Sequence, residues 1–227
     1  MSDPVLIFDL DGTLVDSAPD LTHSLNYTLT GDGLETAELS EVRKMVGQGA
    51  RRLIETAVEW QGADRSTAEV DALLDIFLDH YSRNLCVDTA AFPGVAETVE
   101  QLARRHKLGI CTNKPVDLAV RLVADLGYAG YFPVILGGDS LPWKKPDARH
   151  IDATRDRLAP GARAIMVGDS MTDIGAARNA GIPVIAVSYG YTAIPVADFK
   201  ADVVVDHFAD LPAAIDEIIS SGLLDRQ

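Results

Sequence analysis

The stretch VLIFDLDGT, residues 5–13, decides how this chain folds. Its first four residues are all apolar, which is typical of a strand buried on both faces of a parallel sheet. Two aspartates follow at once, together with a glycine that permits a sharp turn of the backbone. The stretch therefore predicts a buried strand whose carboxyl end carries Asp9 and Asp11. The same residues also fit a simple acidic turn in which Asp11 caps a helix.

Further short apolar runs follow at intervals too wide for hairpins, and amphipathic helical segments separate the later ones. The residues Leu118, Leu122 and Leu126, for example, lie at helical spacing before Gly127. This alternation predicts an α/β fold with a doubly wound, Rossmann-like parallel sheet. The expected strands after the first are 108–111, 134–136, 164–167, 184–187 and 203–205, and a closing helix is expected at 211–219.

The segment 16–90 interrupts this alternation because it contains no strand pattern. A helix is expected to begin at Asp16-Ser17-Ala18-Pro19, with a capping residue and a proline suited to a first turn. More helices are expected at 38–46, 50–60 and 67–81. The sequence thus predicts a catalytic core of residues 1–15 and 91–227 with an all-α helical cap of residues 16–90. Both crossings lie at the carboxyl edge of the sheet, where ligands bind, so the cap can act as a lid.

Composition and charge exclude several classes of protein. The 34 acidic and 20 basic residues give a net charge of −14, which argues against a partner held by neutralising nucleic-acid phosphates. No apolar stretch reads as a membrane span, and no export signal precedes the first strand. Cys86 and Cys111 do not form a disulfide framework. We expect a cytoplasmic protein without nucleic-acid or membrane partners, and no feature of the sequence indicates its oligomeric state.

A second acidic motif, VGDSMTD at 167–173, follows another apolar run. Asp169 and Asp173 are four residues apart at the start of a helix, so both side chains can face one spot. Parallel strands bring this motif and Asp9-Leu10-Asp11 to the same sheet edge. A divalent metal held by oxygen ligands would neutralise these carboxylates and leave one free to attack an electrophile such as phosphorus. The alternative is a helix N-terminus with favourable acidic residues.

Acidic groups alone would repel a phosphate, so the site also needs donors and a positive charge. Thr112, Asn113 and Lys114 follow a third expected strand, where they supply a hydroxyl, an amide and backbone N–H groups at a helix start. Lys144 and Lys145 precede another helix and can offset accumulated negative charge. Taken alone, Thr112 fits a strand-end hydroxyl and Lys145 fits a solvated surface charge.

Taken in order, these motifs resemble the haloacid dehalogenase superfamily of phosphohydrolases, and within it the phosphoglycolate phosphatases. The superfamily motifs are matched by Asp9-Leu10-Asp11-Gly12-Thr13, Thr112, Lys145, and Gly168-Asp169-Ser170 with Asp173. Narrower features also match at 14–20, 46–50, 112–115, 137–139 and 188–191. The resemblance spans nearly the whole chain. One departure is Asp147-Ala148 after Lys145-Pro146, where relatives often carry another proline.

The resemblance implies a role for each motif residue. Asp9 is the nucleophile and a Mg²⁺ ligand, and Asp11 is the general acid/base whose backbone carbonyl also reaches the metal. Asp169 ligates the metal, and Asp173 ligates it or orients it through water. Lys145 neutralises charge, and it is chosen over its neighbour because the family lysine usually precedes a proline directly.

The phosphoryl oxygens are implied to be held by Thr112 and by the backbone of Asn113. These core motifs contact only the group that all phosphomonoesters share, so discrimination between substrates must come from the cap. The loop Gly47-Gln48-Gly49 joins two expected cap helices, and its glycines permit close approach of a small ligand. We therefore place Gln48 and Arg51 near the non-phosphoryl end of the substrate. The alternative is an ordinary turn between helices.

The expected function is a Mg²⁺-dependent phosphomonoester hydrolase that works through an aspartyl phosphate, with 2-phosphoglycolate as substrate. Alternatives are a phosphatase or phosphomutase for another small phosphorylated metabolite, such as a sugar phosphate, a nucleotide or pyrophosphate. β-Phosphoglucomutase-like enzymes tend to carry a cap histidine where this chain has Leu21, and His23 lies two residues away. A dehalogenase needs neither Asp11 nor the metal pair. A non-enzymatic binding module of the same fold predicts the loss of a motif residue, and none is missing.

Overall fold

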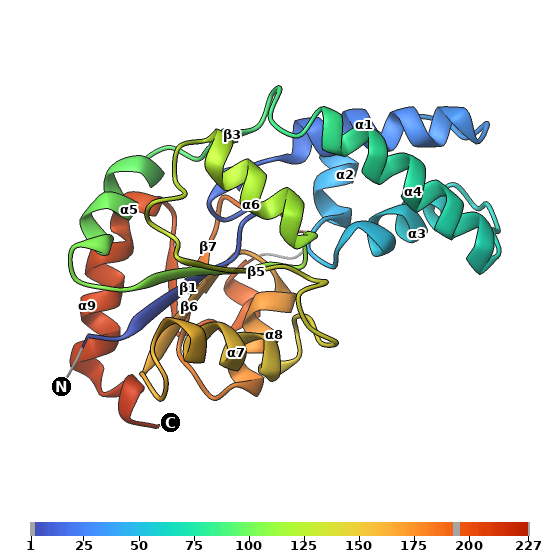
Figure 1. Cartoon of the computed structure of the whole chain (residues 1–227). Coiled ribbons are helices and arrows are strands. Elements are labelled where there is room, and N and C mark those ends of the chain that lie inside the picture. The colour runs from blue at the N-terminus through green and yellow to red at the C-terminus, as the bar shows by residue number, and fades with distance from the viewer. Residues whose placement is uncertain (1–2, 193–195, 227) are drawn as a thin grey trace.

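The structure, a computed structural model, describes residues 3–192 and 196–226 of the chain. Its centre is a six-stranded sheet in the order β5-β4-β1-β6-β7-β8, in which every neighbouring pair is parallel (Figure 1). The expected doubly wound parallel sheet is therefore confirmed. The strands are β1 (Val5–Phe8), β4 (Leu108–Cys111), β5 (Val134–Leu136), β6 (Ala164–Gly168), β7 (Val184–Val187) and β8 (Val203–Val205).

Helices cover both faces of this sheet because successive strand residues point to opposite sides. From β1, Leu6 and Phe8 join the apolar core under α5, α6 and α9, whereas Val5 and Ile7 join the core under α7 and α8. These helices are α5 (Val95–Ala103), α6 (Val116–Asp125), α7 (Ala148–Leu158), α8 (Met171–Asn179) and α9 (Leu211–Ser221). Short 3₁₀ helices lie at Val196–Phe199, Phe208–Asp210 and Leu223–Arg226.

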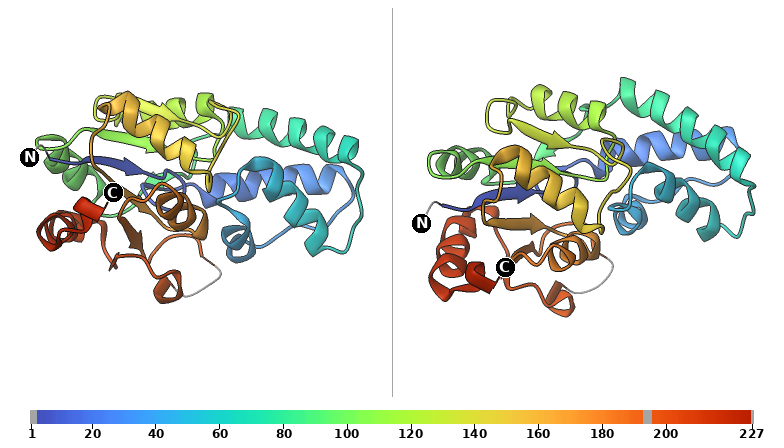
Figure 2. Two further views of the ribbon diagram at one scale, coloured as in Figure 1. Left: turned by 90° about the horizontal axis from the view of Figure 1, so that it is seen from below. Right: turned by 60° about the horizontal axis from the view of Figure 1, so that its bottom comes forward.

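The segment after β1 forms a separate helical layer, as the absence of alternating strand patterns predicts. Its helices are α1 (Ala18–Gly31), α2 (Leu39–Met45), α3 (Ala50–Trp60) and α4 (Thr67–Arg83). α1 and α3 both pack on α4, and their shared core contains Leu25, Ile54 and Phe77. Figure 2 shows this layer projecting from one end of the sheet, beyond the tip of β1. That is the end where ligands bind in folds of this kind.

The two crossings between sheet and cap contain strands that the sequence patterns do not predict. β2 (Val15–Asp16) and β3 (Ala90–Ala91) pair antiparallel and form a two-stranded ribbon. Our expectation of no strand in 16–90 is wrong at these edges, because two-residue strands are too short to show a period-2 pattern. The ribbon places both crossings side by side, so the two chain connections between core and cap run next to each other.

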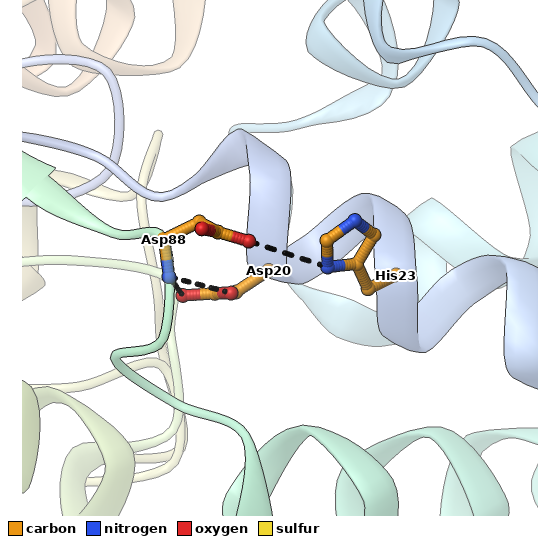
Figure 3. Close-up of side chains that lie close together, drawn as sticks. All are labelled: Asp20, His23 and Asp88. Atoms are coloured by element: carbon orange, nitrogen blue, oxygen red, sulfur yellow. Dashed lines mark hydrogen bonds and ion pairs between the residues drawn. The ribbon is translucent and has the colours of Figure 1, made fainter.

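Asp20, in the first turn of α1, holds residues 87–89, where the chain returns from the cap to the core; we call this segment the return crossing (Figure 3). Its buried carboxylate accepts hydrogen bonds from the backbone N–H groups of Val87, Asp88 and Thr89 at 2.9–3.1 Å, and from the Thr89 hydroxyl at 2.7 Å. His23 lies 3.7 Å from the Asp88 carboxylate on the exposed side of the same cluster. The hydrogen bonds to both Asp20 oxygens hold the chain crossing against α1.

Among the described residues, no helix is both long enough and apolar enough to span a bilayer.

Candidate active site

β1 carries the first acidic motif to the middle of the sheet's carboxyl edge. The Asp9 backbone N–H donates to the Val167 carbonyl at 2.9 Å, which fixes the end of β1 against β6. The Asp9 side chain is buried, and one of its oxygens accepts the Leu10 N–H at 2.7 Å. Asp11 lies two residues further along and faces the cap. The positive φ of Gly12, +85°, makes the tight turn between them and the cap crossing possible.

β6 delivers the second acidic motif beside the first, because Phe8 and Val167 are register partners in neighbouring parallel strands. The Asp169 carboxylate accepts the Thr13 hydroxyl and the Tyr191 N–H, each at 2.7 Å. These two bonds go to different oxygens of the carboxylate and hold Asp169 in one orientation. The sequence expectation that both motifs meet at one edge therefore agrees with the geometry.

Asp173 lies in the first turn of α8 and is fully enclosed. One of its oxygens accepts the backbone N–H groups of Asp169 and Ser170, at 3.1 and 3.0 Å, and the Ser170 hydroxyl at 2.7 Å. Its other oxygen lies 2.6 Å from the ammonium of Lys145. Both oxygens thus have protein partners, an arrangement that suits a residue that orients the site.

The donor set fits a hard divalent cation. Ligand oxygens of Asp9, Asp169 and Asp173 all lie within 4.8 Å of one another. Burial, together with the charge of neighbouring carboxylates, raises the pKa values of Asp9 and Asp169 above their ordinary range. A cation bound between them would offset this repulsion, and carboxylate oxygens are the ligands that Mg²⁺ prefers. Gly12 also leaves room here, because a Cβ on it would lie 2.4 Å from an Asp169 oxygen.

Lys145 supplies the positive charge that the sequence argument required at this edge. Its side chain is enclosed, and its Nζ lies 2.9 Å from Asp9 and 2.6 Å from Asp173. Burial lowers its pKa, but the charges of Asp173 and Asp9 outweigh burial and raise it above the ordinary value. Lys145 is therefore not a solvated surface charge. Lys144, in contrast, is exposed and donates to the Gln48 carbonyl at 3.0 Å.

Thr112 and Asn113 lie at the end of β4, beside Asp9 on the neighbouring strand. The Asn113 side-chain amide donates to the Lys145 carbonyl at 3.1 Å and to the Gly47 carbonyl of the cap at 3.0 Å. It thereby ties a core loop to a cap loop. The Thr112 hydroxyl accepts the Lys114 N–H at 3.3 Å, and it remains within the same pocket as Asp9.

A pocket between core and cap is lined by four of the nine expected site residues. Core residues Asp9, Asp11, Thr112 and Asn113 line one side, and cap residues including Leu21, Gly47, Phe77 and Tyr81 line the other. The structure does not bring Gln48 and Arg51 into this pocket. They line a neighbouring one together with Arg52, Glu55, Lys144 and Lys145. The Arg51 guanidinium pairs there with Asp71 and Glu55.

Comparison with known proteins identifies the family. Residues 6–187 match the model of the family described as haloacid dehalogenase-like hydrolase. The chain belongs to this family. Similar proteins include the phosphoglycolate phosphatase of Agrobacterium fabrum, 43% identical over 222 residues that cover 96% of this chain and 95% of the relative. The phosphoglycolate phosphatase of Mesorhizobium japonicum is also 43% identical, with 96% of both chains covered.

A solved structure has the same fold as this chain. The crystal structure of a predicted phosphoglycolate phosphatase from Haemophilus somnus 129pt superposes with a TM-score of 0.88, covering 94% of this chain and 98% of the other, at 34% identity. Phosphatases of the haloacid dehalogenase-like family generally use Mg²⁺. The acidic cluster at the sheet edge of this hydrolase is where a metal can bind.

Three residues of this hydrolase were not assigned to its site from the sequence: Ser17 and Lys114, which contact Asp11, and Tyr81, which contacts Lys114. Ser17 was expected to cap α1, but its side chain makes no cap bond and instead donates to Asp11 at 2.5 Å. Lys114 places its Nζ 3.0 Å from Asp11 and 2.5 Å from the Tyr81 hydroxyl. Lys114 stands in a motif quoted for the resemblance, whereas Tyr81 lies on a cap helix face that looks only like core in the sequence.

Proposed function

We propose that this protein is a cytoplasmic, Mg²⁺-dependent phosphatase whose substrate is 2-phosphoglycolate. The observation that carries the proposal is the placement of Asp9 and Asp11 in a pocket that the cap closes, beside a buried acidic cluster and the buried Lys145. The names of the relatives at 43% identity support the substrate. We further propose that residues 16–90 act as a cap on a catalytic core of residues 1–15 and 91–227.

In the proposed reaction an oxygen of Asp9 attacks phosphorus, and the bond from phosphorus to the ester oxygen breaks. Asp11 gives its proton to the leaving alkoxide, then takes a proton from the water that hydrolyses the aspartyl phosphate. Thr112 and the backbone of Asn113 hold the phosphoryl oxygens, and Lys145 offsets their charge. Mg²⁺ held by Asp9, Asp169, the Asp11 carbonyl and, directly or through water, Asp173 would polarise the phosphoryl group.

Gln48 and Arg51 line the neighbouring pocket and not the pocket of Asp9, so we assign them a different role. Arg51, Arg52 and Lys144 line this pocket beside Lys145, and Asp71, Glu55 and Glu59 pair with the two guanidinium groups. Cations at the mouth of a site raise the rate at which an anionic substrate arrives. We therefore propose that Gln48 and Arg51 belong to the entrance of the site and contact the substrate during its approach.

Hydrolysis is favoured over phosphomutase chemistry by the cap residues at the pocket. Leu21 lines the pocket, and the cap offers no histidine among the described residues that surround it. The His23 side chain is 62% exposed and pairs with Asp88 at the return crossing. In a mutase the aspartyl phosphate transfers its phosphoryl group back to the bound substrate, and the cap histidine that such enzymes tend to carry is replaced here by the apolar Leu21.

The proposal is tested by measuring phosphate release from 2-phosphoglycolate, sugar phosphates, nucleotides, pyrophosphate and pyridoxal phosphate, with Mg²⁺ and with EDTA. We expect the highest kcat/KM for 2-phosphoglycolate and loss of turnover with EDTA. Asp9→Asn should abolish turnover because an amide is a poor nucleophile, whereas Asp156→Asn, an exposed aspartate on α7, should leave it unchanged. Near wild-type activity in pure Asp9→Asn protein would refute the mechanism.

A further inference from the structure

Lys114 is a buried cation that touches both the core and the cap. It follows β4, and its side chain is only 3% exposed. Its Nζ lies 3.0 and 3.3 Å from the two oxygens of Asp11, and 2.5 Å from the hydroxyl of Tyr81 on α4. The same ammonium lies 4.5 Å from the centre of the Tyr81 ring. Lys114 therefore occupies the boundary between the reacting groups and the lid.

The surroundings of Lys114 suit it to bind a second anionic group of the substrate, in addition to the phosphate. Among the described residues that line the pocket of Asp9, Lys114 is the sole cation. Lys145 is already held between Asp9 and Asp173. The cap side of the pocket is otherwise apolar, with side chains that include Leu21, Leu53 and Phe77. Burying an ammonium in such a place is costly unless it is well paired.

The chemistry of Asp11 places the substrate's second anion beside Lys114. To protonate the leaving group, Asp11 must lie within hydrogen-bond reach of the ester oxygen. In a phosphorylated α-hydroxy acid, one carbon separates that oxygen from the carboxylate. The carboxylate must therefore lie close to Asp11, and the ammonium of Lys114 already contacts Asp11 at 3.0 Å. The Tyr81 oxygen accepts from Lys114, so its own O–H is left to donate to the same carboxylate.

We infer that Lys114 is the specificity-determining residue that selects substrates carrying a carboxylate next to the phosphate ester, with Tyr81 of the cap as its partner. The inference rests on the proposed phosphatase function and adds the group that reads the non-phosphoryl end. It also gives the cap a role in substrate selection, because the hydrogen bond from the Lys114 ammonium to the Tyr81 hydroxyl forms only when α4 lies over the core.

The test combines a change in the enzyme with a matched change in the substrate. 2-Hydroxyethyl phosphate keeps the size of 2-phosphoglycolate but replaces the carboxylate with a neutral alcohol. For wild-type protein and Lys114→Met we would measure kcat/KM on both substrates in the same preparation. The ratio of the two values does not depend on the fraction of folded enzyme. Removing one member of a buried charge pair should lower this ratio by about 30-fold to 5,000-fold.

Two further variants separate recognition of the carboxylate from general damage. Lys114→Arg should keep most of the preference because the positive charge remains. Lys107→Met removes an exposed lysine just before β4 that donates to the Leu158 carbonyl at 3.0 Å, away from the pocket. It should leave the ratio unchanged.

The outcomes distinguish this inference from the proposed function. If Lys114→Met loses activity equally on both substrates, Lys114 only positions Asp11 and the inference is overturned. If wild-type protein prefers another phosphorylated hydroxy acid, such as 2-phospholactate, and Lys114→Met abolishes that preference, phosphoglycolate is the wrong substrate but the role of Lys114 stands. A wild-type enzyme that prefers 2-hydroxyethyl phosphate would overturn both.

Discussion

Replacing Asp20 with alanine removes the carboxylate that fastens the return crossing to the cap. Its hydrogen bonds come from three backbone N–H groups and one hydroxyl, and two of these donors belong to the buried Thr89. The donors of Val87 and Asp88 lie in exposed residues, so water can replace their acceptor after the change. The two Thr89 donors remain without one, and each costs about 1–3 kcal/mol. We expect Asp20→Ala to lower the free energy of unfolding by about 2–6 kcal/mol.

Urea unfolding followed by circular dichroism measures this change, and amide hydrogen exchange at 87–89 locates it. The matched control is Asp88→Ala in the same cluster, whose side chain is 54% exposed and makes only a distant pair with His23. Surface pairs of this kind contribute about 0–1 kcal/mol, so the control should stay close to wild type. A loss below about 1 kcal/mol in Asp20→Ala, or equal losses in both variants, would refute the reasoning.

Three more predictions concern catalysis. Asp11→Asn should lower kcat by ~10² to 10⁴, the usual contribution of a general acid/base. In single-turnover measurements Asp11→Asn should lower the rate of the phosphorylation step less for an aryl phosphate than for an alkyl phosphate, because a good leaving group needs less proton transfer. Asp169→Asn should raise the Mg²⁺ concentration needed for half activity, as measured by metal titration, because it removes a carboxylate ligand. Arg51→Ala should lower kcat/KM for 2-phosphoglycolate several-fold at low ionic strength, and added salt should remove the difference between variant and wild type.

Each of these three predictions would be contradicted by a specific result. Equal losses on aryl and alkyl phosphates would make Asp11 a structural residue. An unchanged metal requirement would remove Asp169 from the ligand set. A loss in Arg51→Ala that persists in high salt would point to a direct contact with bound substrate, and no loss at any salt would exclude Arg51 from the entrance.

The sequence alone was enough to predict the sheet and the meeting of its acidic motifs. Apolar runs such as 5–8 and 164–167 identify buried strands, because both faces of those strands are covered by helices. Helical spacing is the wrong reason for the closeness of Asp169 and Asp173, because Asp169 precedes the N-cap Ser170 and lies outside α8; its N–H donates to the Asp173 carboxylate in the first turn. Parallel strands end at a common edge, so the neighbourhood of Asp9 and Asp169 follows from local pattern and topology without any knowledge of packing.

The tertiary structure decided how the cap completes the site. Ser17 looks like a helix cap and Tyr81 like a core residue in the sequence, yet the side chains of both contribute to the surroundings of Asp11. Gln48 and Arg51 stand in a loop that suits a binding role, yet they line a neighbouring pocket. These contacts join residues far apart in the chain and depend on how two packed bodies meet across the β2–β3 ribbon. Local periodicity reports which face of an element is buried, but it carries no information about which distant side chain will lie against that face.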